Sequence, residues 1–180
     1  MIKRKNPTYF GGLMIALELT NIKDFMNKLL RSEVFDHFLL QEGVITTGAT
    51  YSINGQITKG FYSEEEMEEL HLEGCRFLPF SMLRTNCFDI IKGKKTPSAF
   101  RFVFLLSPKN MEKTIASVGS SYNASDVTGM YINLKYQNQL LSLTTGIAYN
   151  IFSTDKTLES EWDKMVMKFL KQHEIEFEEI

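Results

Sequence analysis

Alternating apolar and polar residues are clearest between residues 128 and 153. Every second residue from 130 to 136 is apolar, which is the period of a strand with one buried face. Residues 137–139 are Gln-Asn-Gln and supply a reversal, after which the alternation resumes over 141–145 and, past a glycine, over 147–151. The pattern predicts three antiparallel strands on short connections, with the rest of the chain assembled around them.

Helical spacing recurs in three other stretches, where apolar residues lie three and four positions apart. These amphipathic helices are predicted over about 22–32, 81–91 and 157–172. A serine cap at Ser107, before a proline, indicates a shorter helix. Ser63 is a second such cap, and the acidic run after it is interpreted as a short exposed helix or a solvated loop.

The remaining apolar runs predict strands. In one of them, residues 49–53 and 56–62 flank Asn54-Gly55, a dipeptide strongly favoured in two-residue hairpin turns. The order along the first third of the chain is therefore strand, helix, strand, hairpin. The other runs that read as strands are 14–20, 35–47 and 100–106.

These elements predict an α+β fold: a mostly antiparallel sheet with amphipathic helices packed on it, including a C-terminal helix. One domain is expected over residues 14–172. The strands of 128–153 are expected to close the sheet and to leave an open edge for self-association. Burial of Tyr131, Asn133 and Lys135 at a subunit interface would support that association.

Both ends of the chain differ from the predicted domain. Residues 1–13 have no periodicity and are interpreted as a loose leader, with Met14 as the expected true start. Residues 173–180 form an acidic tail with spaced apolar residues. The tail has two interpretations, an added edge strand or a short disordered peptide.

Composition is that of an ordinary globular protein. The 180 residues are 43% hydrophobic and 23% charged with a net charge of −2, so any surface that attracts polyanions must be local. No apolar run approaches the ~20 residues that span a bilayer, and the basic residues 3–5 are not followed by the apolar stretch of a secretory signal. We therefore expect a cytoplasmic protein with no membrane partner.

Residues that could carry catalysis or bind a metal are sparse. His71 and Cys75 are four positions apart and Cys87 follows, a set that could in principle hold zinc. Cys87 fits the apolar stripe of its helix, however, and we predict neither a metal nor a cofactor. His37 is interpreted as a strand-end residue rather than a base. No catalytic residue is assigned, because nucleophile-elbow and phosphate-loop motifs are missing, and residues 93–96 only faintly resemble the latter.

Two charge clusters remain. Residues 64–73 and 174–180 are acidic and are interpreted as solvated surface. Basic residues of the helices at 22–32 and 81–91 would share one face if these helices lie side by side, and such a face is sufficient to hold a phosphate backbone. A solubilising face is the plain alternative. The candidate anion or nucleic-acid contacts are Lys28, Arg31, Arg84, Lys92, Lys94 and Lys95.

Four segments carry a resemblance to a known family. They are 22–30 (IKDFMNKLL), 88–97 (FDIIKGKKTP), 106–110 (LSPKN) and 162–166 (WDKMV), together with the acidic C-terminal end. Over residues 14–180 the chain resembles an uncharacterised family of clostridial, gut-type Gram-positive bacteria, a domain of unknown function. The resemblance implies a fold and a start at Met14, and no activity.

The order of elements is also similar to one domain of a DNA sliding clamp, in which two helices present basic side chains to DNA. Residues 98–119 and the last helix have no counterpart in that plan, and one domain would need several copies to close a ring. A clamp-like fold is therefore an expectation from fold analogy and carries no site evidence.

Three functions follow as hypotheses. The first is a non-catalytic binding protein, with an unknown protein partner, with a second copy, or with nucleic acid through the basic residues. The second is an enzyme, which a deep pocket gathering His37 with carboxylates, Tyr149 or Cys75 would favour. The third is a structural subunit of a larger assembly. Whether the protein is an enzyme stays open, with the missing motifs favouring a non-enzyme.

Overall fold

A computed structural model describes residues 9–10 and 15–180. Its strands are β1 (Tyr9–Phe10), β2 (Ala16–Leu19), β3 (Leu39–Thr46), β4 (Thr50–Asn54), β5 (Ala99–Leu105), β6 (Val127–Gln137), β7 (Leu140–Tyr149) and β8 (Phe177–Glu179). Its α-helices are α1 (Ile22–Arg31), α2 (Glu64–Glu69), α3 (Phe80–Ile91), α4 (Pro108–Ser117) and α5 (Thr157–Gln172).

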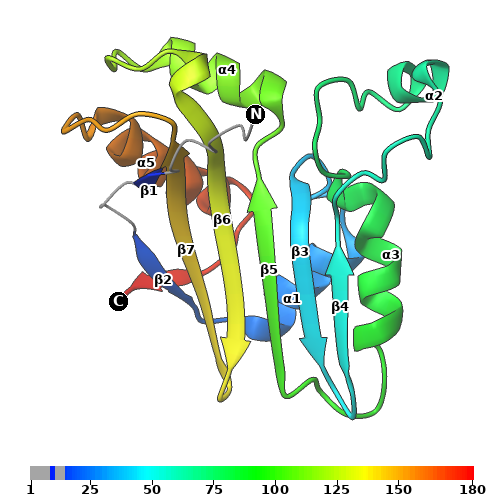
Figure 1. Cartoon of the computed structure of the whole chain (residues 1–180). Coiled ribbons are helices and arrows are strands. Elements are labelled where there is room, and N and C mark those ends of the chain that lie inside the picture. Colours follow the sequence, from blue (N-terminus) through cyan, green and yellow to red (C-terminus); the bar gives the residue numbers. More distant parts are fainter. Residues whose placement is uncertain (1–8, 11–14) are drawn as a thin grey trace.

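The strands form one antiparallel sheet in the order β4-β3-β5-β6-β7-β2-β8, and β1 also pairs with β7 (Figure 1). Helices α1 and α5 lie behind the strands in Figure 1, and α4 lies across one end of the sheet. The predicted α+β class, with a mostly antiparallel sheet, amphipathic helices and a C-terminal helix, is confirmed.

An aromatic cluster holds the helices on one face of the sheet. The ring of Phe104 in β5 lies 5.6 Å from Phe35 and 5.0 Å from Phe80, the first residue of α3. Phe35 in turn contacts Phe25 of α1 at 5.7 Å and Phe169 of α5 at 5.5 Å. Since burying one such side chain contributes roughly 1.5–3 kcal/mol, this cluster is a large part of what fixes three helices on the sheet.

Local sequence sets the starts of three helices, two of them at the predicted serine caps. The side chain of Asn21 accepts a hydrogen bond from the first turn of α1. Ser63 and Glu66 form a reciprocal capping box at α2, with distances of 3.1 and 2.8 Å. At α4, the Ser107 hydroxyl accepts the N–H of Asn110 at 3.4 Å. These caps satisfy N–H groups that have no partner inside a helix.

The predicted three-stranded meander is wrong in two respects. Residues 128–153 contain two long strands, because Gly146 continues β7 opposite Tyr131 instead of ending it. The pair is also central, since β5 pairs along β6 and β2 pairs along β7. Tyr131, Asn133 and Lys135 therefore belong to an inner strand. The edges of the described sheet are elsewhere, at β4 and β8.

The predicted hairpin around Asn54-Gly55 is also wrong. β4 pairs with β3 through a turn at residues 47–49, so Asn54 is the end of β4. Gly55 is required for another reason: its N–H donates to the carbonyl of Gln41 at 3.1 Å, and a Cβ there would lie 1.7 Å from the carbonyl oxygen of Leu40. The glycine marks a close approach of two backbones and not a turn.

Strand β2 and the acidic tail meet at one side of the sheet. β8 pairs with β2, so the acidic tail forms the edge strand, the first of its two interpretations. Ile175, which is 4% exposed, anchors the tail in the core. Within the predicted leader, Tyr9–Phe10 pair with Tyr149 and Ala148 of β7. The rest of the leader, and Met14 as a start, lie outside the described residues.

Candidate functional site

A groove of about 320 Å³ lies between α1, α3 and the segment that joins α3 to β5. Helices α1 and α3 pack side by side, as the shared-face prediction requires. The start of β5 and the end of β6 form the base of the groove. Four of the six predicted contacts line it together: Arg31, Lys92, Lys94 and Lys95.

Charge in this groove has one sign, because its lining has four cationic side chains and no carboxylate. The Arg31 guanidinium lies 5.3 Å above the ring of Phe88, and the Lys92 ammonium lies 5.8 Å from the same ring. Lys92 also pairs with Asp89 at 2.6 Å, but both side chains are more than half exposed, so water screens the pair. Within the described part of the chain, Lys94 and Lys95 form no ion pair.

The other two predicted contacts lie outside the groove and have partners of their own. Lys28 pairs with Asp24 at 2.6 Å and donates to the carbonyl of Glu174 at 2.7 Å. Arg84 donates to both carboxylate oxygens of Asp36, at 2.8 and 3.1 Å. Bidentate ion pairs between an arginine and a carboxylate are strong and directional, so Arg84 joins α3 to the turn before β3.

Aromatic side chains of the groove are not among the predicted contacts. Phe88 lies one helical turn before Lys92, and this spacing could have revealed that the two share a face. Tyr136 stacks on Phe100 with ring centroids 5.1 Å apart and planes 19° from parallel. Tyr136 reaches the groove through the pairing of β6 with β5, for which the local sequence has no signal.

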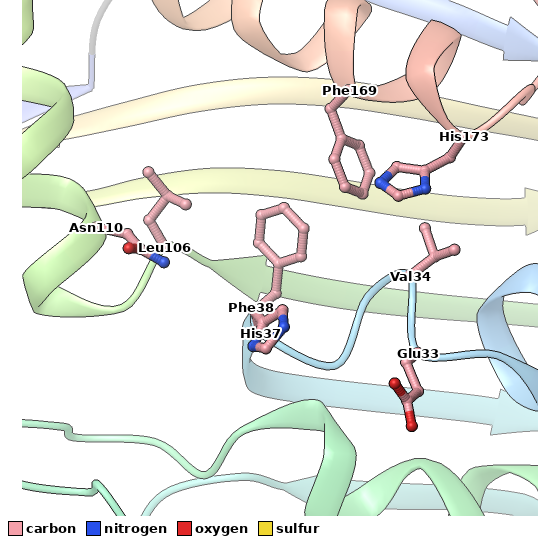
Figure 2. Close-up of a pocket in the computed structure, with 8 residues that line it drawn as sticks. All are labelled: Glu33, Val34, His37, Phe38, Leu106, Asn110, Phe169 and His173. Atoms are coloured by element: carbon pink, nitrogen blue, oxygen red, sulfur yellow. The ribbon is translucent and has the colours of Figure 1, made fainter.

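A second hollow, the cavity of Figure 2, has a volume of about 480 Å³ and opens between residues 33–38, α4 and α5 (Figure 2). The rings of Phe38 and Phe169 form its apolar wall, 5.4 Å apart and nearly perpendicular. The lining contains one carboxylate, two imidazoles and no lysine or arginine. Its polar side chains are Glu33, His37, Asn110 and His173.

His37 and Asn110 also line an adjoining cavity of about 530 Å³. This cavity contains the combination that favours an enzyme, His37 with carboxylates and Cys75. Its further titratable side chains are Asp36, His71, Glu73 and Lys109. Tyr149, the remaining member of the predicted combination, lies elsewhere: it is buried and stacks on Tyr122 at 4.6 Å.

Neither the Cys75 thiol, which lines this cavity, nor the buried Cys87 thiol is activated as a nucleophile. Burial, with the nearby Glu73 carboxylate, raises the pKa of the Cys75 thiol. Burial also raises the pKa of Cys87 to about 12. A cysteine reacts as the thiolate, so these pKa shifts lower the reactive fraction of both thiols at neutral pH. Among residues 15–180, no three His, Cys, Asp or Glu side chains come together as metal ligands, which includes the set of His71 with these two thiols.

The described helices include none with the length and apolar character needed to cross a membrane. A family of unknown function (DUF5721) matches residues 28–178. No curated protein and no solved structure matches the chain. The matched range contains the four cations of the groove and the polar side chains of the cavity in Figure 2.

Proposed function

Since the chain belongs to DUF5721, a family of unknown function, we propose its function from the geometry: a non-catalytic protein that binds the backbone of single-stranded nucleic acid in the groove between α1 and α3. The observation that carries the proposal is the lining of four cations without a carboxylate. Lysine and arginine hold phosphates by charge, irrespective of base sequence.

Aromatic side chains in the groove favour an unpaired strand over a duplex. Bases that are free to turn outward stack on aromatic rings and on arginine planes, at about 1–3 kcal/mol per base. Phe88 carries Arg31 on its face, and Tyr136 lines the base of the same groove. A volume of about 320 Å³ suits one base of the strand, while the exposed Lys92, Lys94 and Lys95 would hold phosphates on either side of it.

The other binding hypotheses make different predictions. A clamp-like protein would bind duplex DNA as a ring of several copies, and a protein partner or self-association would not need the groove cations. The nucleic-acid proposal agrees with a cytoplasmic location and with a bacterial, clostridial source. Both stay predictions. A duplex of equal length, added as competitor, separates strand binding from clamp-like binding.

Fluorescence anisotropy with a labelled strand of about twelve nucleotides, as DNA and as RNA, tests the proposal. Four contacts at about −0.7 each predict that log K falls with log salt with a slope near −3. The double variant Lys94→Ala/Lys95→Ala is expected to halve this slope and to weaken binding at least about tenfold at ~50 mM salt.

The matched control is Lys59→Ala/Lys113→Ala, which removes the same charge from exposed positions. Lys113 belongs to α4 and Lys59 to the segment before α2, and Figure 1 shows these elements at the opposite end of the sheet from the α3–β5 segment. The control should bind as the parent does. Equal losses of affinity in both variants, or binding that salt leaves unchanged, would contradict binding in the groove. No binding at low salt would rule out nucleic-acid binding as the function.

A second candidate function is acid–base chemistry in the cavity of Figure 2, favoured by its two imidazoles and one carboxylate beside an apolar wall. The NMR signals of the histidine imidazoles report whether a ligand binds in this cavity. A small molecule that shifts the signals of His37 and His173 together, and not those of His71, would support a site there. Shifts of His37 and His71 without His173 would place the ligand in the adjoining cavity.

A further inference from the structure

A third hollow, of about 360 Å³, lies on the face of the sheet opposite α1 and α5. Its base is the row Leu39, Leu105 and Tyr131, which pair across β3, β5 and β6. This row is one residue away from the core row that contains Phe104, so its side chains project from the other face. Residues 74–77 and α4 border the hollow.

Arg76 is the single charged side chain in the lining of this third hollow. Its guanidinium carbon lies 5.4 Å from the centre of the Phe77 ring, and its carbonyl accepts the N–H of Ile57 at 3.0 Å. No ion pair of Arg76 occurs among residues 15–180. Leu39 and Leu105, which are 4% and 6% exposed, supply an apolar base. A guanidinium above such a base attracts an anion that carries an apolar body.

Three neutral polar side chains accompany the arginine: Gln41, Thr128 and Tyr131. Tyr131 lies close over Gly129, where a Cβ would be 2.6–2.8 Å from the Tyr131 ring and hydroxyl, so only glycine leaves room for the ring. Burial raises the pKa of Tyr131, which keeps its hydroxyl a donor. Gln41, the extra residue at the bulge in β3, adds an amide to the lining.

We propose that this hollow binds a small carboxylic acid with an apolar body. Arg76 holds both carboxylate oxygens, the Tyr131 hydroxyl and the Gln41 amide donate to them, and the body of the ligand packs on Leu105 and Met111. One cation matches one carboxylate, whereas a phosphate dianion would be left partly unpaired among apolar side chains. The inference is independent of the nucleic-acid groove, which lies on the other face.

Isothermal titration calorimetry of the full chain tests the proposal with two probes, decanoate for an aliphatic body and 3-phenylpropionate for an aromatic one. Each is compared with its uncharged amide. One acid is expected to bind at least about tenfold more tightly than its amide, because the amide cannot form a bidentate ion pair with Arg76. Arg76→Gln should abolish this preference, and Tyr131→Phe should reduce it.

The matched control is Arg101→Gln. Arg101 lies on the same open face, where it pairs with Glu42 at 2.7 Å, outside the lining of the hollow. Circular dichroism and melting confirm that each variant is folded. Preference for decanoate assigns an aliphatic acid and preference for 3-phenylpropionate an aromatic one. Equal binding of acid and amide, no binding of either acid up to its solubility limit, or an unchanged preference in Arg76→Gln would overturn the proposal.

Discussion

The groove between α1 and α3 and the cavity of Figure 2 are built on the same face of the same sheet, yet their charges are opposite. The groove has four cations and no carboxylate, whereas the cavity has one carboxylate and no lysine or arginine. Both have aromatic walls: Phe88 and Tyr136 in the groove, Phe38 and Phe169 in the cavity. The aromatic core therefore determines where a hollow forms, and the connecting segments determine which charge it accepts.

The largest effect is expected where both hollows share support. Phe104 is fully buried and contacts Phe35, Phe38 and Phe80, which hold the helices around both hollows. Phe104→Ala should lower the free energy of unfolding by about 3–5 kcal/mol, because it leaves a cavity in this cluster. Urea denaturation measures the loss.

The control for this substitution is Phe61→Ala, at a ring that is 71% exposed, where a change within about 0.5 kcal/mol is expected. Similar values for the two variants would show that the hollows do not depend on a common core.

An intermediate effect is expected from Asp163. This residue belongs to α5, which lines the cavity of Figure 2 and not the groove, so only one of the two hollows depends on it. Asp163 accepts a hydrogen bond from the Thr145 hydroxyl, and burial raises its pKa above the ordinary 3.8. The folded protein thus holds this proton more tightly than the unfolded chain. The protonated Asp163 carboxyl therefore contributes to the free energy of unfolding at low pH, and this contribution is lost as pH rises through the pKa of the folded protein.

Asp163→Asn keeps an acceptor for Thr145 and removes the titration. The variant should gain melting temperature over the parent, and its advantage should be larger at about pH 8 than at about pH 4. The difference between parent and variant isolates this carboxyl from the others that titrate in acid. An advantage that does not change with pH would count against a burial penalty at Asp163.

The smallest effect is expected at the exposed pair of Asp89 with Lys92. Asp89→Asn should change the free energy of unfolding by less than about 1 kcal/mol, because exposed pairs contribute little. The same change removes the carboxylate that pairs with Lys92 of the groove and should raise affinity for the single strand about twofold at low salt. Weaker strand binding in this variant would mean that the pair positions Lys92 for its ligand.

Features with a local cause could be predicted from the sequence. The starts of α1, α2 and α4 follow from side chains that cap the backbone within three residues. Lys92, Lys94 and Lys95 are near one another in the chain, so they stay together in any fold. Arg31 joins them because α1 and α3 lie side by side, which is the condition for a shared face. Nearness in the chain therefore identified three of the four cations in the groove, and Arg31 depended on the packing of the helices.

Features with a distant cause could not be predicted. Gly55 is next to an asparagine, as in a hairpin turn, but the reason for the glycine is the carbonyl of Leu40 on another strand. The cavity of Figure 2 collects Glu33, Asn110 and His173 from three separate elements. Each of these residues looks ordinary in its own segment, so only the assembled sheet reveals that they share a hollow.

The pairing of β2 with β7 and β8 fixes when the molecule can become complete during synthesis. β2 is made near the start, but its partners are residues 142–144 and 177–179. At about 5–20 residues per second, β2 waits on the order of ten seconds for them on a translating ribosome. The hairpin of β6 and β7 can meanwhile form at once from neighbouring residues. That side of the sheet is therefore the last to close, and the interval before closure is when a newly made chain is most exposed to aggregation.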